Sequence, residues 1–279
     1  MPELPEVETI KNQLAEVLVG RRVVALQVKH PKSFYGSAKL IVGEKIIDVK
    51  RRAKILIVEL KDLSVLIHLK MTGQLVYQGE KRRVVGGHPT ADWVAKLPNV
   101  HTRVVIQLEK GTLYFNDQRI FGWMKLVDKD GLDKEFKNYG PDIINVDKEY
   151  FWKIVQKSRR AIKLVTMDQK DVAGVGNIYA NDALWCAKIS PMRKANSLTR
   201  PESDKLLTSL KEVINEGIKY GGATASDDKF VQTSGLGGKY QEHFKVYERS
   251  GQKCLSCGSI IKKMTLGGRG TYWCEECQS

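Results

Sequence analysis

The sequence predicts an α+β protein of two domains: a β-rich N-terminal half that opens with one helix, and a helical C-terminal half that ends in a zinc ribbon. Three observations predict this fold class. Short runs of β-branched and aromatic residues dominate the first half, helical periodicity dominates the second, and two Cys-x-x-Cys pairs lie near the C-terminus. With 279 residues, the chain is long enough for two domains and a sizeable core.

The first element that we expect is a helix that opens the chain. Apolar residues recur at helical spacing from Val7 to Leu18, and Gly20 suits the end of the helix. Pro2 and Pro5 suit a first helical turn. These residues alone therefore favour a helix opening with no further role.

The same N-terminus has a chemical alternative. If Met1 is removed, Pro2 becomes a secondary amine, and an α-amino group titrates near pH ~8. Such an amine can attack an electrophilic carbon and form an iminium (Schiff base) intermediate, while Glu3 supplies or removes a proton. On these residues alone this is the less favoured interpretation.

The region after the opening helix predicts a β-sandwich or barrel. Its β-rich runs are separated by Gly, Pro or charged turns and lie at 24–28, 55–60, 65–69, 104–108 and 113–115. A polar connection at 130–145 is the expected domain boundary.

Helices are expected beyond the connection. Asp147 suits the cap of one helix, and Thr199 with Glu202 suits a capping box for another. The glycine-rich stretch 221–240 has little apolar periodicity and predicts a mobile loop. The chain thus divides into a β-rich domain at 1–131, a helical domain at 132–244 and a finger at 245–279.

The charge of the chain indicates a polyanionic partner. Lys and Arg number 46 against 32 Asp and Glu, which gives a net charge of +14. Nucleic acid is the leading candidate, because Lys and Arg that neutralise phosphates drive such binding, and a membrane surface is the alternative. No apolar stretch approaches the length that spans a bilayer. We expect a monomeric cytoplasmic protein associated with the nucleoid.

The two cysteine pairs predict a metal site. Cys254 and Cys257 are followed, after sixteen residues, by Cys274 and Cys277. Each pair can hold one side of a tetrahedral Zn²⁺, and four thiolates leave no open position for catalysis, so we expect one structural Zn²⁺. Arg269 lies in a glycine-rich tip between the pairs, where it either contacts a partner or forms a solvated basic turn.

A second glycine-rich segment lies at 172–179, and Asn177 is inside it. Arg159 and Lys163 lie shortly upstream. A glycine turn that leads into a helix exposes backbone N–H groups, so this segment suits a clamp on a DNA backbone. A plain helix–helix turn is an equal alternative.

Three strand ends carry further candidates. Met71 and Phe121 each follow an expected strand, and Phe121 stands beside Arg119. Apolar wedges next to a cation can enter a duplex and fill the space of an extruded base. Taken singly, Met71 and Phe121 are more often core residues, and Lys54 is more often a surface cation at a strand end.

Together these residues resemble the formamidopyrimidine-DNA glycosylase family, which consists of bifunctional enzymes of base excision repair. The resemblance runs over almost the whole chain, and the order and spacing of its parts make it specific. The matching segments are Pro2–Thr9, Arg51–Lys54, His68–Gly73, Asn116–Gly122, Asp168–Gln169 with Val172–Ala180, and the four-cysteine finger that ends at Gln278.

The resemblance implies an N-terminal β-sandwich that carries the opening helix, a helical domain with a helix-two-turns-helix motif, and a zinc finger. It implies a partner that is double-stranded DNA with oxidised bases or abasic sites, bound across a cleft. The implied activity is that of a DNA glycosylase and AP lyase that excises oxidised purines such as 8-oxoguanine and formamidopyrimidines and cleaves the strand by β,δ-elimination.

The resemblance also implies roles for single residues. Pro2 becomes the Schiff-base nucleophile at C1′, Glu3 the proton donor at the sugar, Lys54 an assistant at the lesion, and Arg269 the residue for δ-elimination. His101, Arg119, Lys163 and Asn177 match DNA-contacting positions of the family, and Met71, Arg119 and Phe121 match the triad that fills the vacated base stack.

Two departures concern DNA recognition rather than chemistry. Ile120 stands where the family usually has a basic or polar residue, and the sequence from 221 to 228 is not the commonest version. An endonuclease VIII-like glycosylase for oxidised pyrimidines is therefore the nearest alternative, although Leu4 and 7–9 favour the purine branch. A zinc-ribbon DNA-binding protein without activity is the other, and it gives no reason for Pro2, Glu3 or Lys54.

Overall fold

A computed structural model describes residues 1–224 and 237–279. Two compact units make up the chain. Unit 1 consists of 1–137 with 220–239, and unit 2 of 138–219 with 240–279. The mobile loop expected at 221–240 lies mostly outside the described residues.

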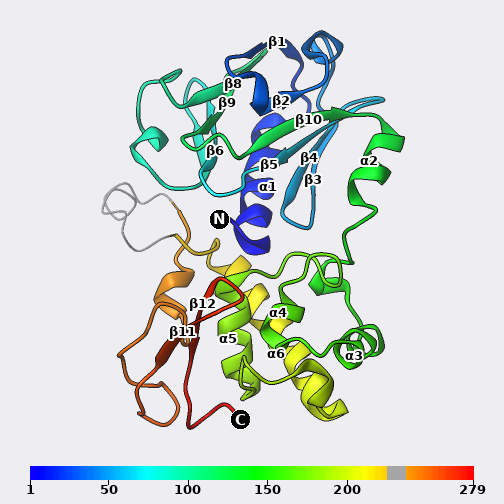
Figure 1. The fold of residues 1–279 in the computed structure, drawn as a ribbon. Coiled ribbons are helices and arrows are strands. Elements are labelled where there is room, and N and C mark those ends of the chain that lie inside the picture. Colours follow the sequence, from blue (N-terminus) through cyan, green and yellow to red (C-terminus); the bar gives the residue numbers. More distant parts are fainter. Residues whose placement is uncertain (225–236) are drawn as a thin grey trace. The chain divides into compact units, whose positions relative to one another are not determined.

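Unit 1 contains two five-stranded sheets and the opening helix (Figure 1). Their strand orders are β1-β8-β9-β6-β7 and β2-β10-β5-β4-β3, and every pairing is antiparallel except the short parallel contact of β2 with β10. The strands are β1 (Val23–Val28), β2 (Phe34–Tyr35), β3 (Asp48–Arg52), β4 (Ile55–Glu59), β5 (Ser64–His68), β6 (Gly73–Gln78), β7 (Arg83–Gly87), β8 (Thr102–Leu108), β9 (Thr112–Asp117) and β10 (Trp123–Val127).

One hydrophobic core joins both sheets and the helix. It includes Ile106 and Phe115 from the first sheet, Leu56 and Ile67 from the second, and Leu14 from α1. Because side chains of both sheets fill a common core, the N-terminal half is a β-sandwich, as predicted. The short helices of unit 1 are η1 (Pro31–Ser33), η2 (Ala38–Ile41), η3 (Ala91–Trp93) and α2 (Lys129–Phe136).

Helix α1 (Leu4–Leu18) begins and ends where its sequence predicts. Its apolar stripe is buried, and it packs against β3 of one sheet and β7 of the other. The backbone N–H of Glu3 donates to Glu6 Oε2 over 2.7 Å, which satisfies one of the donors that a helix start leaves unpaired. Gly20, with φ of +82°, follows the last turn.

The first sheet of the sandwich is covered on its other face as well. Trp93 and Leu97 pack there against Val76, Val105 and Tyr114, in a second core. The segment from β7 to β8 therefore lies over the sheet as a packed strap, and it holds the residues around His101 in place.

Unit 2 is helical and ends in a two-stranded finger (Figure 1). The expected caps form: Asp147 Oδ1 accepts the N–H of Tyr150 over 2.7 Å, and Glu202 Oε2 accepts that of Thr199 over 2.7 Å. The elements are η4 (Ile143–Asn145), α3 (Lys148–Lys157), α4 (Ile162–Thr166), α5 (Asn177–Ala187), η5 (Ala195–Ser197), α6 (Arg200–Lys219), η6 (Tyr240–His243), β11 (Lys262–Leu266) and β12 (Arg269–Trp273). Across the described ranges, none of the helices is long and apolar enough to cross a membrane.

Candidate active site

The N-terminal residues form a buried start of α1. Pro2 is buried and Glu3 is only 4% exposed, whereas Met1 is 48% exposed. The Glu6 carboxylate holds the Glu3 backbone through Oε2. An amine at Pro2 would thus be presented from a fixed position and not from a loose chain end.

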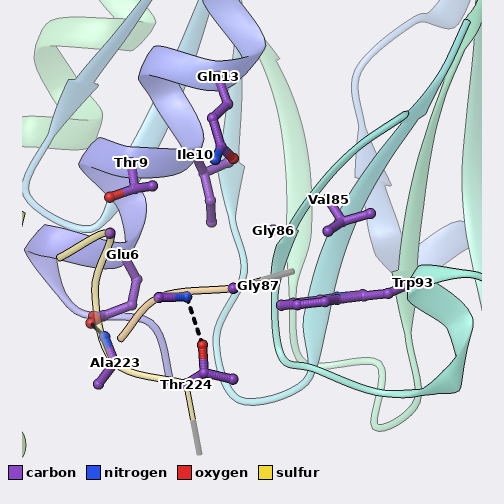
Figure 2. A pocket seen from close by; sticks show the side chains of 13 residues that line it. Glu6, Thr9, Ile10, Gln13, Val85, Gly86, Gly87, Trp93, Ala223 and Thr224 are labelled. Carbon is purple, nitrogen blue, oxygen red and sulfur yellow. Dashed lines mark hydrogen bonds between the residues drawn. The ribbon is translucent and has the colours of Figure 1, made fainter. Parts of the chain in front are cut away.

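The same carboxylate also binds the segment after α6. Glu6 Oε1 accepts the N–H of Ala223 over 2.7 Å, so Glu6 joins the start of α1 to the chain at 220–224 (Figure 2). Gly222 has φ of +83°, and a Cβ there would lie 2.7 Å from Glu6 Cγ. The double glycine in the sequence therefore permits this close approach.

A pocket of about 90 Å³ lies beside this junction, between α1, β7 and the segments 221–224 and 237–238 (Figure 2). The N–H of Gly238 donates to Thr224 Oγ1 over 2.8 Å, and the N–H of Lys239 donates to the carbonyl of Tyr220 over 2.8 Å. These two bonds join residues 238–239 to residues 220–224 next to Glu6.

Lys54 lies in the tight turn between β3 and β4 and is 6% exposed. Arg51 ties this turn to α1, because its Nε donates to Glu8 Oε2 over 2.7 Å and its Nη1 to the carbonyl of Ala53 over 2.9 Å. Burial opposes the ionisation of Glu8, but hydrogen bonds from Lys11 and Arg51 outweigh it and hold the Glu8 pKa below its usual value. The fold thus fixes the Lys54 turn relative to the helix that begins beside Pro2.

The two wedge candidates lie at the surface. Met71 is 39% exposed and Phe121 is 53% exposed, which excludes the interpretation of either as a core residue. The Arg119 guanidinium lies 4.7 Å from the centre of the Phe121 ring, a cation–π contact. Apolar side chains of this size are available to enter a duplex.

One buried carboxylate organises the segments that carry these wedges. Asp117 is 0% exposed, and it accepts hydrogen bonds from the Thr72 hydroxyl, from the Arg119 N–H over 3.2 Å and from the Gly122 N–H over 2.6 Å. Its own N–H donates to the carbonyl of His101 over 2.9 Å. Asp117 therefore brings together three segments that the sequence assigned separately to DNA. Its position inside the 116–122 segment was the only sequence signal.

Replacing Asp117 by Asn is expected to destabilise the fold by about 2–3 kcal/mol, because an amide NH₂ would then face donors inside the protein. The free energy of unfolding, measured in denaturant, checks this. The affinity for lesion-containing DNA should fall as the wedge segments loosen. The matched control is Asp133→Asn, which makes the same charge change at an exposed position of unit 1. Equal unfolding free energies for the two variants would contradict the role of Asp117.

Among the described residues of this unit, three that are not glycine have left-handed backbone conformations. Each directly precedes a predicted site residue: Ala53 (φ +55°) precedes Lys54, Lys70 (φ +51°) precedes Met71, and Ile120 (φ +58°) precedes Phe121. Such conformations are uncommon outside glycine, and for a β-branched residue such as Ile120 they are outliers that cluster at functional sites.

His68 supports the turn before Met71. Its Nδ1 accepts the N–H of Lys70 over 3.0 Å, which requires a ring nitrogen without a proton. Burial, with smaller contributions from the charges of Lys70 and Lys54, lowers the pKa of His68 to about 3. The ring is therefore neutral at physiological pH and remains an acceptor.

In unit 2, Lys163 lies away from the surface. It is 0% exposed, and its ammonium donates to the carbonyl of Gly270 over 2.9 Å and to Thr271 Oγ1 over 2.7 Å. The Thr271 hydroxyl in turn donates to the carbonyl of Arg269 over 3.1 Å. Lys163 thus supports the backbone next to Arg269, whose side chain is exposed. Because the Lys163 side chain has no exposed surface, it is not available for the predicted contact with DNA.

The glycine-rich turn leads into α5 as the sequence suggested. Gln169 stabilises it by accepting the N–H of Gly174 over 2.9 Å and by donating to the carbonyl of Val175 over 2.8 Å. Asn177 is the first residue of α5, and it is partly exposed. Arg159, before α4, is exposed. Both side chains are thus at or near the surface of unit 2.

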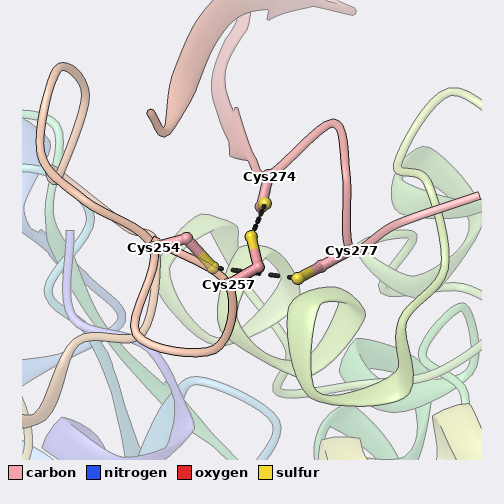
Figure 3. A group of neighbouring side chains, drawn as sticks. All are labelled: Cys254, Cys257, Cys274 and Cys277. Atoms are coloured by element: carbon pink, nitrogen blue, oxygen red, sulfur yellow. Dashed lines mark hydrogen bonds between the residues drawn. The ribbon is translucent and has the colours of Figure 1, made fainter. Parts of the chain in front are cut away.

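The four cysteines of the finger come together as predicted. Their sulfur atoms point toward one another and lie within 4.8 Å, with 3.9 Å between Cys254 and Cys277 and 3.5 Å between Cys257 and Cys274 (Figure 3). Tetrahedral Zn²⁺ with Zn–S bonds of about 2.3 Å places its sulfurs about 3.8 Å apart. These residues therefore fit one structural zinc ion.

Helix α5 stabilises the finger through hydrogen bonds of Trp185 and Asn181. Burial disfavours the Cys254 thiolate, but N–H groups of Cys257, Ser256 and Trp185 outweigh this and lower the Cys254 pKa to about 6, which suits a zinc ligand. Asn181 Oδ1 accepts the N–H of Tyr272 over 2.8 Å.

Comparison with known protein families gives a match for each of the three parts of the chain. The profile of the formamidopyrimidine-DNA glycosylase N-terminal domain matches residues 1–124, that of the H2TH domain of the same enzyme matches 140–229, and that of a zinc finger found in FPG and IleRS matches 251–279. The chain belongs to the formamidopyrimidine-DNA glycosylase family. It is a DNA glycosylase and AP lyase of base excision repair, with one structural zinc.

Relatives and solved structures from this family match the chain over its whole length. The formamidopyrimidine-DNA glycosylases of Listeria monocytogenes and Pelotomaculum thermopropionicum are 35% and 37% identical to this chain, and each match covers 100% of the chain and at least 99% of the relative. A Lactococcus lactis Fpg mutant bound to Fapy-dG-containing DNA aligns with a TM-score of 0.87 at 32% identity, covering 99% of each chain. The Lactococcus lactis Fpg bound to abasic-site DNA aligns with a TM-score of 0.86 at 31% identity over 100% of each chain.

Proposed function

We propose that this enzyme excises oxidised purines, 8-oxoguanine and formamidopyrimidines among them, through a Schiff base at the Pro2 amine. The observation that supports this most is the buried Pro2–Glu3 start of α1, held by Glu6. The substrate class is supported by family members solved with Fapy-dG-containing DNA and with DNA containing carbocyclic 8-oxo-G.

The reaction begins with attack of the Pro2 amine on C1′ of the damaged nucleotide. Glu3 serves the proton transfers at the sugar, and Lys54, fixed in its turn by Arg51, assists at the lesion. The bond from C1′ to the base breaks as the bond to the amine forms, and the base leaves with a proton. The bond from C1′ to O4′ then breaks, with O4′ taking a proton from Glu3, and this gives an iminium ion. The iminium ion acidifies the adjacent C2′ proton, whose removal eliminates the 3′ phosphate. A second elimination, assisted by Arg269, removes the 5′ phosphate.

The DNA contacts divide between the two units. In unit 1, Met71, Arg119 and Phe121 fill the space of the extruded base, and His101 binds a phosphate. In unit 2, Arg159 and Asn177 bind the DNA backbone, while Lys163 acts through the finger that it supports and not by direct contact. The zinc holds the finger in shape and takes no part in the chemistry.

The same proposal gives each segment a function. Residues 1–131 carry the chemistry, 132–244 bind DNA and 245–279 form the finger. The protein acts as a monomer on chromosomal DNA in the cytoplasm. Its net charge of +14 supports an electrostatic search of undamaged duplex before a lesion is extruded.

Borohydride trapping on a panel of lesions tests mechanism and specificity together. We expect covalent complexes with duplexes that contain 8-oxoguanine or an abasic site, and much slower trapping with thymine glycol. A panel is needed because a Lactococcus lactis relative has been solved with DNA containing an oxidised pyrimidine. A clear preference for thymine glycol would place the enzyme with the endonuclease VIII-like glycosylases instead.

A further inference from the structure

A buried carboxylate that the sequence did not single out holds His101. Asp92 lies in η3 with its side chain 10% exposed, and its Oδ2 is 2.8 Å from His101 Nδ1. Asp92 Oδ1 accepts from Asn99 Nδ2 over 2.7 Å, and Asn99 Oδ1 accepts the backbone N–H of His101 over 2.9 Å. The three residues close a ring of hydrogen bonds that fixes both the imidazole and the backbone of His101.

The support of this ring reaches into the sandwich. Gln74 of β6 donates through Nε2 to Thr90 Oγ1 over 2.7 Å, and Thr90 Oγ1 accepts the N–H of Asp92 over 3.2 Å. On the other side, the His101 carbonyl accepts the N–H of Asp117 over 2.9 Å. His101 is thus linked to the carboxylate that organises the wedge segments, and its position depends on the folded core.

The contact with Asp92 indicates which nitrogen of the His101 ring carries a proton. An ionised carboxylate only accepts hydrogen bonds, so Nδ1 of His101 is the donor to Asp92. The other nitrogen, Nε2, makes no hydrogen bond within residues 1–224 and 237–279, and the side chain is 33% exposed. Nε2 is a donor to an external phosphate only when the ring carries both protons, and the resulting positive charge is then paired with Asp92.

We propose that Asp92 is a positioning residue that makes His101 a charged donor to a DNA phosphate through Nε2. The proposal rests on the assignment of His101 to DNA in the proposed function. Asp92 itself does not touch the substrate, since its two oxygens are occupied by Asn99 and His101.

The proposal predicts that loss of the Asp92 charge weakens DNA binding. Asp92→Asn removes a negative charge from a protein that binds a polyanion, and the charge change alone would strengthen DNA binding. In the variant the amide oxygen can accept from Asn99 Nδ2 and the NH₂ can donate to His101 Nδ1, but only when the ring is the neutral tautomer with its proton on Nε2. The donor to the phosphate then has no positive charge and no carboxylate to pair with one, so binding becomes weaker.

The test measures binding to a duplex with a tetrahydrofuran abasic-site analogue over a range of salt concentrations. We expect Asp92→Asn and His101→Ala each to weaken binding about 10-fold. Each should also reduce the slope of log K against log salt by about 0.9, the value for one phosphate contact. The double variant should bind no more weakly than His101→Ala, because Asp92 acts only through the imidazole.

Two controls separate the proposal from a general loss of structure. Asp62→Asn removes the same charge at an exposed turn of unit 1 and should leave binding unchanged or slightly tighter. In the wild-type enzyme, which needs no variant to fold, ¹⁵N spectra of the histidines should show His101 protonated at Nδ1 in the free state and at both nitrogens in the DNA complex.

Two results would overturn the proposal: binding by Asp92→Asn that equals or exceeds that of the wild type, or a His101 ring that keeps a proton on Nε2 alone. Failure of the proposed function is distinguishable, since it would appear as absence of borohydride trapping in the wild-type enzyme. The Asp92→Asn variant is expected to retain trapping at saturating protein, because it leaves Pro2 and Glu3 untouched.

Discussion

Enzyme that retains Met1 is expected to form no borohydride-trapped complex with lesion-containing DNA and to bind that DNA with unchanged affinity. The nitrogen of Pro2 is an amide in that form, and an amide nitrogen cannot attack C1′. Removal of Met1 creates a secondary amine at a buried and fixed helix start. Mass spectrometry of the N-terminus, trapping yield and DNA affinity, measured on the same two preparations, check the prediction.

Substitution at the nucleophile should give the same separation of binding from chemistry. Pro2→Gly in processed protein is expected to lower the trapping rate about 100-fold or more, with a small change in affinity, because a glycine amine is less constrained and less reactive. Pro5→Ala is the matched control, since it removes the proline of the first helical turn and leaves the amine intact. Trapping by protein shown to retain Met1 would refute the assignment of Pro2.

Removal of the zinc ion is expected to abolish strand cleavage by δ-elimination and to weaken DNA binding at least 10-fold. The four thiolates hold the finger in shape, and apparent binding energies of structural zinc in finger peptides, about 10–16 kcal/mol, are folding energies of those peptides. Without zinc, the Gly270 carbonyl and the Thr271 hydroxyl would no longer be presented to Lys163. Unit 2 should also unfold at a lower temperature.

Cysteine variants make this prediction specific. Cys277→Ser should reproduce the effect of a chelator, because it removes one ligand of the zinc. Cys186→Ser is the matched control: its thiol lies outside the cluster, and burial, aided by the charge of Asp182, raises its pKa to about 11. Intact δ-elimination and intact affinity after complete release of zinc, quantified with a metal indicator, would show that the finger has no part in the reaction.

Local signals in the sequence were sufficient for the ends of α1, for the helix caps at Asp147 and Thr199, and for the cysteine cluster. Each depends on residues within a few positions of one another, where spacing alone fixes geometry. The strands with weak alternation were missed. β3 reads Asp-Val-Lys-Arg-Arg and β7 ends in two glycines, and both exist because a neighbouring strand pairs with them.

The site residues that the sequence did not identify depend on contacts over long separations. The same holds for the role of Lys163, which the sequence predicted as a DNA contact, yet its partner Gly270 lies 107 residues away. Asp92 and Asp117 are ordinary acidic residues until the fold buries them among donors. No periodicity or spacing in the sequence predicts such a carboxylate, because its role depends on its neighbours in three dimensions and not on its place in a helix or strand.

The left-handed residues before Lys54, Met71 and Phe121 reverse the usual order of tolerated replacements. At most positions alanine is the safe substitution and glycine the costly one, since glycine loses more conformational freedom on folding. At 53, 70 and 120 a side chain costs about 1–2 kcal/mol in the folded backbone, so glycine is the mild change there and valine the severe one. Sequences of this enzyme can therefore drift at these three positions toward glycine or asparagine without moving the functional residue that follows.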